Sequence, residues 1–244
     1  MSTDKQEVPP DILTAGFHSR GYLPHLKAEG KSYFVTFRLA GTLLKEVLLR
    51  LKLERERILQ NALAHKRPLT SEEQDELFLW YSTKVDSYLD AGRGECFLAN
   101  PKIASVVVDA LRCFEGERYE LRSWVVMPNH VHVVVWPKPP VTLSAILHSW
   151  KSFTATKANR ILERTGDNFW QRESYDHFVR DDEEMTRCCS YTIHNPVKAG
   201  LCERVEDWRW SSAYRLGAGS RPNQQAKMPA LRAEPAPPTT EDAP

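Results

Sequence analysis

The chain has 244 residues, of which 41% are hydrophobic and 27% are charged. These proportions exclude a mostly disordered chain, a collagen-like chain and a protein with many membrane spans. The 33 basic and 32 acidic residues nearly cancel and leave a formal net charge of +1. Bulk charge therefore gives no argument for binding nucleic acid, and any such argument has to be local.

The N-terminus, the length of the apolar runs and the cysteines bear on the compartment of the protein. Residues 1–10 are polar and lack the apolar stretch of a secretory signal. No run approaches roughly 18 apolar residues, so no transmembrane helix is expected. The five cysteines are odd in number and include no C-x-x-C pair. We therefore expect a cytoplasmic protein in a reducing compartment, without a disulfide framework or a cysteine-zinc site.

The first predicted elements are a strand and two helices. Aromatic and β-branched residues over 32–39 predict the strand. Leucines and alternating charges over 43–64 recur at helical spacing. Thr70-Ser71-Glu72-Glu73 is a capping box, which predicts a second helix that ends near residue 89. We interpret 43–92 as a helical insertion; two ordinary scaffold helices are the alternative.

Residues 100–194 predict an alternation of helices and strands. Asn100 and Pro101 provide an N-cap and a first-turn proline. Pro128 and Asn129 separate two strand-like runs, which predicts an antiparallel hairpin. The expected elements, in chain order, are a helix over 100–114, strands over 119–127 and 130–136, a helix over 142–164, an extended piece over 176–180 and a helix over 181–194.

This order of elements predicts an α+β fold, with a ferredoxin-like antiparallel sheet, helices on one face and the helical insertion. Residues 1–30 are polar and are expected to form an N-terminal arm. Residues 217–244 contain six prolines and no apolar periodicity, so we expect a disordered tail. The single domain is expected to span 31–216.

His130-Val131-His132 is the sharpest chemical motif. Alternate residues of a strand share a face, so both histidines project to one side and Val131 to the other. Two such imidazoles can reach one divalent ion at about 2.1 Å. The alternative is a pair of histidines on a half-exposed strand face, without a metal.

Tyr191 and Asn195 stand four residues apart on the last predicted helix, so they share a face. If that helix crosses the histidine face of the sheet, Asn195 Oδ1 becomes a third metal ligand and Tyr191 a nucleophile beside the metal. A phenol has a pKa near 10 and needs help, which a Lewis acid on a phosphoryl oxygen provides.

Each of these residues also has a plainer interpretation. Tyr191 can be a buried core tyrosine. Asn195 precedes Pro196, which disfavours a helical conformation, so it can instead cap a short turn that ends at Gly200. Tyr175 is a rival nucleophile, although no amide faces it at helical spacing.

Local charge is positive on the helix predicted over 142–164. Lys157, Arg160 and Arg164 recur at i, i+3 and i+7, on one face, which suits contact with a phosphate backbone. Lys151 on the same helix and Arg180 beyond it complete the predicted DNA-binding set. A merely solvated helix face is the alternative for each of these residues.

Taken together, these residues resemble the REP-associated tyrosine transposases, which are single-tyrosine HUH transposases of the IS200-like superfamily. The resemblance runs from about residue 21 to residue 214, and its short motifs are specific only as an ordered set. They are Gly-Tyr-Leu-Pro-His (21–25), Phe-Val-Thr-Phe-Arg-Leu (34–39), Trp-Val-Val-Met-Pro-Asn-His-Val-His (124–132), Trp-Lys-Ser-Phe-Thr (150–154), Phe-Trp-Gln (169–171), Tyr-Asp-His (175–177), Arg-Asp-Asp-Glu (180–183), Tyr-x-x-x-Asn-Pro-Val-Lys-Ala-Gly-Leu (191–201) and Trp-Ser-Ser-Ala (210–213).

The resemblance implies a single-strand DNA endonuclease and strand transferase that depends on Mg²⁺ or Mn²⁺. It matches His130 and His132 to the HUH histidines, Tyr191 to the nucleophile and Asn195 to the third metal ligand. In such enzymes the tyrosine attacks the scissile phosphate, forms a 5′-phosphotyrosine and frees a 3′-hydroxyl, so strands can be rejoined without ATP.

The resemblance also implies partners. These are single-stranded DNA hairpins formed by palindromic repeats, with no membrane partner, and a place near the bacterial nucleoid. A monomer is expected, with a dimer as the alternative. Two other functions stay open: a domesticated protein that binds DNA hairpins without cleaving them, and a metal hydrolase of small phosphoesters that would not need Tyr191.

Overall fold

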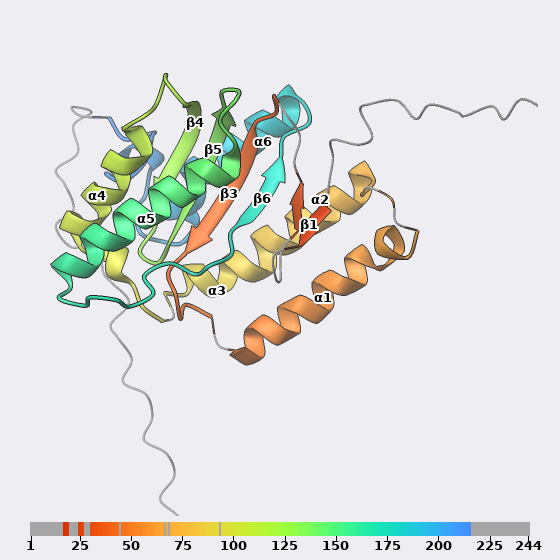
Figure 1. The fold of residues 1–244 in the computed structure, drawn as a ribbon, viewed down its shortest axis with the longest axis horizontal. Coiled ribbons are helices and arrows are strands. Elements are labelled where there is room, and N and C mark those ends of the chain that lie inside the picture. Colours follow the sequence, from red (N-terminus) through yellow and green to blue (C-terminus); the bar gives the residue numbers. More distant parts are fainter. Residues whose placement is uncertain are drawn as a thin grey trace, which may run out of the picture.

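A four-stranded antiparallel sheet forms the centre of the computed structural model (Figure 1). Its strand order is β4-β5-β3-β6, so the first of these strands in the chain lies between the third and the last. With a helix after the first strand and another after the third, this is the ferredoxin-like α+β arrangement that the sequence predicts. The strands are β3 (Tyr33–Arg38), β4 (Tyr119–Val126), β5 (His130–Pro137) and β6 (Tyr175–Phe178). The structure describes residues 17–19, 24–26, 30–43, 45–65, 67, 69–92 and 94–215.

Helices α4 (Pro101–Arg112) and α5 (Leu143–Ile161) cover one face of the sheet, as predicted. Asn100 caps α4 as expected, because its Oδ1 accepts from Lys102 N at 3.0 Å, and Thr142 caps α5, because its Oγ1 accepts from Ala145 N at 3.3 Å. The odd-numbered valines of β5 pack beneath these helices, together with side chains such as Phe37 and Trp150. Each such large apolar side chain contributes roughly 1.5–3 kcal/mol on burial.

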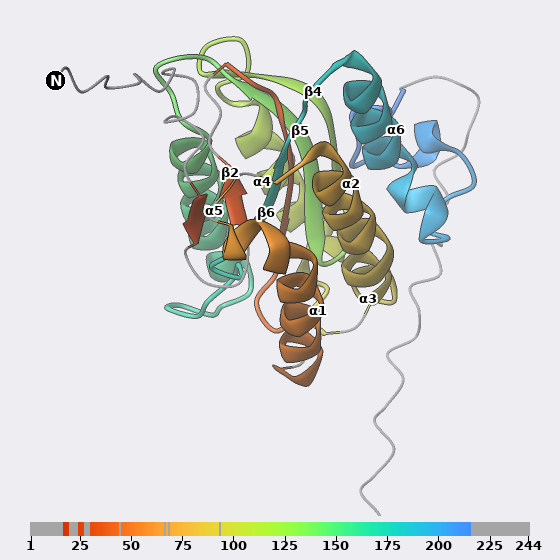
Figure 2. The same cartoon turned by 90° about the vertical axis from the view of Figure 1, so that its right-hand side faces the viewer.

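The opposite face carries a second layer of helices (Figure 2). It consists of α2 (Ser71–Trp80), the π-helical turn η2 (Tyr81–Val85), α3 (Asp86–Asp90) and α6 (Asp182–Lys198). Phe34 of β3 and Val134 of β5 point to this side and pack against Tyr81, Val85 and Leu89. The segment interpreted as an insertion therefore builds part of the hydrophobic core, so its second half serves as scaffold.

The first half of that segment is α1 (Lys45–Ala64), which lies against α2. The predicted capping box starts α2, since Thr70 Oγ1 accepts from Glu73 N at 3.2 Å and Glu73 Oε2 accepts from Thr70 N at 2.9 Å. Two single 3₁₀ turns complete the elements, at Phe97–Ala99 and Val205–Asp207.

The predicted arm contains a small antiparallel pair, β1 (Phe17–Ser19) with β2 (Pro24–Leu26), and β2 lies against β6. The predicted tail, residues 217–244, lies outside the described residues. Within the described ranges, no helix combines the length and the apolar character needed to cross a lipid bilayer.

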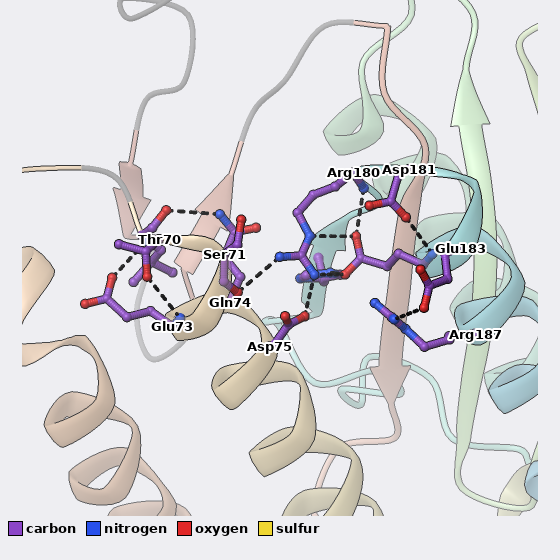
Figure 3. Close-up of polar contacts among 12 residues, drawn as sticks. Thr70, Ser71, Glu73, Gln74, Asp75, Arg180, Asp181, Glu183 and Arg187 are labelled. Atoms are coloured by element: carbon purple, nitrogen blue, oxygen red, sulfur yellow. Dashed lines mark hydrogen bonds and ion pairs between the residues drawn. The ribbon is translucent and has the colours of Figure 1, made fainter.

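A buried ionic network joins α2 to α6 (Figure 3). Glu184 accepts hydrogen bonds from His177 Nε2 at 2.9 Å and from the Arg180 guanidinium at 2.8 and 3.0 Å. Arg180 also donates to Asp75 and to Ser71 O at the start of α2. Burial alone would raise the pKa of Glu184, but the His177 and Arg180 hydrogen bonds outweigh it and hold the pKa at about 2. The network thus fixes α2 to α6.

We predict that Glu184→Gln lowers the free energy of unfolding at pH 7 by about 3 kcal/mol, because it leaves the partly buried Arg180 guanidinium without the Glu184 carboxylate. This loss of stability should shrink as the pH falls from 4.5, the ordinary pKa of a glutamate, towards about 2, the pKa of Glu184 in the fold. Over that range the native carboxylate takes up its proton and ceases to stabilise the fold. Urea unfolding at several pH values measures it. The exposed neighbour substitution Glu183→Gln is the control, and equal stability of the two variants contradicts the prediction.

Candidate metal and tyrosine site

The two histidines lie at the start of β5 and face the second helical layer. Both side chains are completely buried, which excludes the half-exposed strand face. The pairing of β5 with β3 sets His132 beside Thr36 and His130 beside Arg38. The Nε2 atoms of His130 and His132 lie 3.0 Å apart, so both imidazoles converge on one point.

Hydrogen bonds on the far side of each ring orient the pair. Asn129 Nδ2 donates to Leu89 O at 2.9 Å, so Asn129 Oδ1 accepts the Nδ1 proton of His130 at 2.7 Å. His130 Nε2 therefore carries a lone pair, which points towards His132 Nε2 at 3.0 Å. His132 Nδ1 lies 2.7 Å from Thr36 Oγ1. Burial lowers the pKa of His130 to about 3 and that of His132 well below 6.5, so both rings are neutral, the form that binds metal.

Asp86 completes this cluster, and the sequence analysis missed it. It is fully buried on the first turn of α3, directly after the π-helical turn. Its Oδ2 lies 3.5 Å from His132 Nε2, and one ligand atom from each of Asp86, His130 and His132 falls within 4.8 Å of the others. Burial raises the pKa of Asp86 to about 8. Only its place between the apolar residues Val85 and Leu89 hints at an inward-facing acid.

Tyr191 and Asn195 both lie on α6 and both reach the cluster, where Tyr191 contacts Asp86 and the Asn195 amide faces His130. The Tyr191 hydroxyl donates to Asp86 Oδ2 and lies 3.4 Å from Ser82 O. Its ring meets His132 edge to face, with centroids 5.7 Å apart. Burial and the adjacent Asp86 carboxylate raise the pKa of Tyr191, so the phenol keeps its proton at neutral pH.

Asn195 does not cap a turn, contrary to one of the two sequence interpretations. Helix α6 continues through Pro196 to Lys198, and Asn195 O accepts from Ala199 N at 2.9 Å as in any helical turn. Buried packing of Pro196 outweighs the local preference against helix before proline. Both polar atoms of the Asn195 side chain are buried and lack a hydrogen bond among the described residues.

These residues fit a divalent cation. Two ligand atoms that each lie about 2.1 Å from one ion, at a right angle to each other, are about 3.0 Å apart. The Nε2 atoms of His130 and His132 have that separation. Asp86 Oδ1 and Asn195 Oδ1 are buried without a partner among the described residues. Imidazole, carboxylate and amide oxygen together suit several divalent metals, so the donor set does not select one.

The predicted DNA-binding cations divide into two groups. Lys151 donates to Gln171 O at 2.6 Å and Arg172 O at 3.0 Å, and burial lowers its pKa to about 8. Arg180 belongs to the network with Glu184. These two side chains are therefore engaged inside the chain.

Of the other three, Lys157 and Arg160 lie on α5, across the sheet from α6 (Figure 2), whereas Arg164 follows the helix, which ends at Ile161 and not at the predicted residue 164. Lys157 and Arg160 are exposed, whereas Arg164 pairs with Asp167 at 2.8 Å. Their contact with DNA stays a prediction, at a place distinct from the candidate nucleophile.

Two other side chains clarify the site. Tyr175, the rival nucleophile, is 1% exposed and stacks on Tyr81 at 3.7 Å between ring centroids, so it belongs to the core. Lys198, which sequence reasoning did not single out, places its ammonium 5.3 Å from the centre of the Tyr191 ring. It pairs with Asp90 at 3.6 Å, yet its side chain is 46% exposed.

We predict that Asp86→Asn stabilises the metal-free protein, and more at pH 8 than at pH 5. Between pH 3.8 and about 8 the native state holds a proton on Asp86 that the unfolded chain has lost, so this group lowers wild-type stability as the pH rises. Thermal unfolding in EDTA measures the gain.

Asp90→Asn is the matched control, because burial raises the pKa of Asp90 only to about 6. Its gain should level off above that pH. A gain for Asp86→Asn that is equal at pH 5 and pH 8 contradicts the prediction.

Several known proteins are similar to parts of this chain. Residues 105–195 match the family model described as IS200-like transposase. A REP-associated tyrosine transposase of Escherichia coli K12 is 29% identical over 98 residues, which cover 40% of this chain and 56% of that protein. A Haemophilus influenzae protein provisionally given the same name is 44% identical over 46 residues, which cover 19% and 26%. The chain thus spans from a quarter to just over half of the length of these curated relatives.

A solved structure, described as a REP-associated tyrosine transposase bound to a REP hairpin, aligns over 84% of this chain and 98% of that chain. Its sequence identity is 16% and its TM-score is 0.41. The sequence matches confirm the resemblance to REP-associated tyrosine transposases, and residues 105–195 match the IS200-like transposase model.

Proposed function

We propose that this protein is a metal-dependent single-strand DNA endonuclease and strand transferase that acts on hairpin-forming repeats. One observation carries the proposal: the Tyr191 hydroxyl, a phenol set on the last helix, lies in the same buried cluster as His130 and His132. The match to IS200-like transposases and the named E. coli relative support DNA transposition as the setting of this chemistry.

The proposed reaction starts from the Tyr191 oxygen. This oxygen attacks the scissile phosphorus and forms a new O–P bond, while the bond from phosphorus to the 3′-oxygen breaks. The strand that bears the 5′-phosphate stays on Tyr191 as a phosphotyrosine, and the 3′-oxygen of the other strand leaves as a hydroxyl, because the proton lost by the Tyr191 phenol balances the one that it gains. Attack by a 3′-hydroxyl on the phosphotyrosine reverses these bonds, so a strand is rejoined without another energy source.

His130, His132 and Asn195 are the proposed holders of Mg²⁺ or Mn²⁺. When bound, the metal supplies Lewis-acid polarisation of a phosphoryl oxygen. Asn129 and Thr36 keep the imidazoles in place from behind, through hydrogen bonds of 2.7 Å each.

Lys198 is the proposed phosphate-binding cation of the site. Its side chain is half exposed beside the Tyr191 ring, and its ammonium donates to Ser82 O at 3.2 Å. A positive charge next to the attacking oxygen stabilises the charge that develops on the phosphoryl group. This edge, where Tyr191 and Lys198 reach the surface, is therefore the proposed entry for the scissile phosphate.

We predict a covalent adduct between the protein and a single-stranded hairpin oligonucleotide in Mn²⁺, seen as a shifted band on a denaturing gel. Tyr191→Phe should abolish the adduct because the nucleophilic oxygen is gone. Tyr175→Phe, the control, should keep it. His130→Ala should lower its rate of formation at least about 100-fold.

An adduct with Tyr191→Phe would show that another residue is the nucleophile. Hairpin binding by the wild type without any adduct would favour the domesticated, non-cleaving protein. Turnover of small phosphoesters that is independent of Tyr191 would favour the hydrolase.

We also predict that Lys198→Met slows adduct formation about tenfold, or about 1.4 kcal/mol, with hairpin affinity nearly unchanged. The reason is that the lost charge acts on one phosphate near Tyr191. Lys102→Met, an exposed lysine on α4, is the control. Single-turnover gels give the rate and gel shifts give the affinity; equal rates for both variants exclude a role for Lys198.

A further inference from the structure

Asp86 touches both the candidate nucleophile and the histidine pair, and the ligand set proposed so far does not use it. We infer that Asp86 is a further ligand of the divalent metal and that it shares its carboxylate between the metal and the Tyr191 hydroxyl. This inference rests on the proposed function and adds to it a link between metal occupancy and the nucleophile.

The distances support a ligand role. Asp86 Oδ2 lies 3.5 Å from His132 Nε2, and His132 Nε2 lies 3.0 Å from His130 Nε2. One ion can therefore reach all three side chains with only small movements. Asp86 Oδ1 is buried and has no hydrogen bond among the described residues, so an oxygen is available in a place where an unpaired polar atom is costly.

The charges point the same way. His130 and His132 are neutral, and the Asn195 amide carries no charge, so these three ligands alone would leave a buried divalent ion without an anion. Asp86 supplies one. Lys198, whose charge acts on both histidines, directs its ammonium to Asp90 and Ser82 O.

The packing around α3 restricts the Asp86 carboxylate from turning away from the two histidines. The hydrogen bond from Asn129 to Leu89 O ties α3 to the residue that precedes His130. Val85 and Leu89, on either side of Asp86 along the helix, are buried in the core. Asp86 is thus held over the histidines by the same contacts that orient them.

A consequence follows for Tyr191. A hydrogen bond donated to a carboxylate makes that carboxylate a weaker ligand, so the phenol and the metal compete for Asp86. Binding of the metal then weakens the hold of Asp86 on the Tyr191 hydroxyl, which leaves the phenol free to turn to a phosphate. Removal of the hydroxyl should conversely strengthen metal binding.

The test is calorimetric titration of the DNA-free protein with Mn²⁺. Asp86→Asn should weaken Mn²⁺ at least about 30-fold, through loss of an anionic ligand. Asp90→Asn removes the same charge one turn along the chain and should stay within about threefold. Tyr191→Phe should bind Mn²⁺ several-fold more tightly, and Asp86→Asn combined with Tyr191→Phe should bind no better than Asp86→Asn alone.

Each result has one meaning. Wild-type affinity in Asp86→Asn, with circular dichroism confirming its fold, overturns the ligand role while the proposed nuclease function stands. Unchanged affinity in Tyr191→Phe overturns the sharing of the carboxylate. A wild-type protein that binds no Mn²⁺ overturns the metal dependence of the proposed function itself.

Discussion

The hydrogen bond from Asn129 Nδ2 to Leu89 O is the contact on which the candidate site depends. It joins α3 to the turn before β5, and it leaves Asn129 Oδ1 to fix the proton of His130 on Nδ1. The packing of α3 on the sheet excludes water from both imidazoles, which keeps them neutral. The same packing sets Asp86 beside His132. The side-chain amide of Asn129 thus couples the position of α3 to the protonation of His130.

Much of the fold follows from local patterns in the sequence. Thr70 and Glu73, Asn100 and Thr142 act as caps at the helix starts expected of them, because capping depends on a few neighbouring atoms. The alternation of valine and histidine in β5 assigned the faces of that strand correctly. The prediction that helices 100–114 and 142–164 cover one face is confirmed, whereas the second helical layer was not foreseen.

The parts that local patterns could not give depend on long-range packing. Asp86 meets Tyr191 across 105 positions of the chain, and no spacing rule reaches so far. The preference against helix before Pro196 was overridden by burial of that residue. Lys151 and Arg180 looked like surface cations, yet carbonyl and carboxylate oxygens from distant segments hold them inside the chain.

The central position of β3 limits how far this protein can be divided into modules. The segment that matches the transposase family starts at residue 105, which follows both β3 and α3 in the chain. Yet β3 lies between β5 and β6 and supplies Thr36, and α3 supplies Asp86. Excised alone, the matching segment would have a gap in its sheet and an open histidine face. The segment that folds as a unit is therefore longer than the segment of sequence similarity, residues 105–195. Recombination has to pass on the longer segment to keep the fold intact.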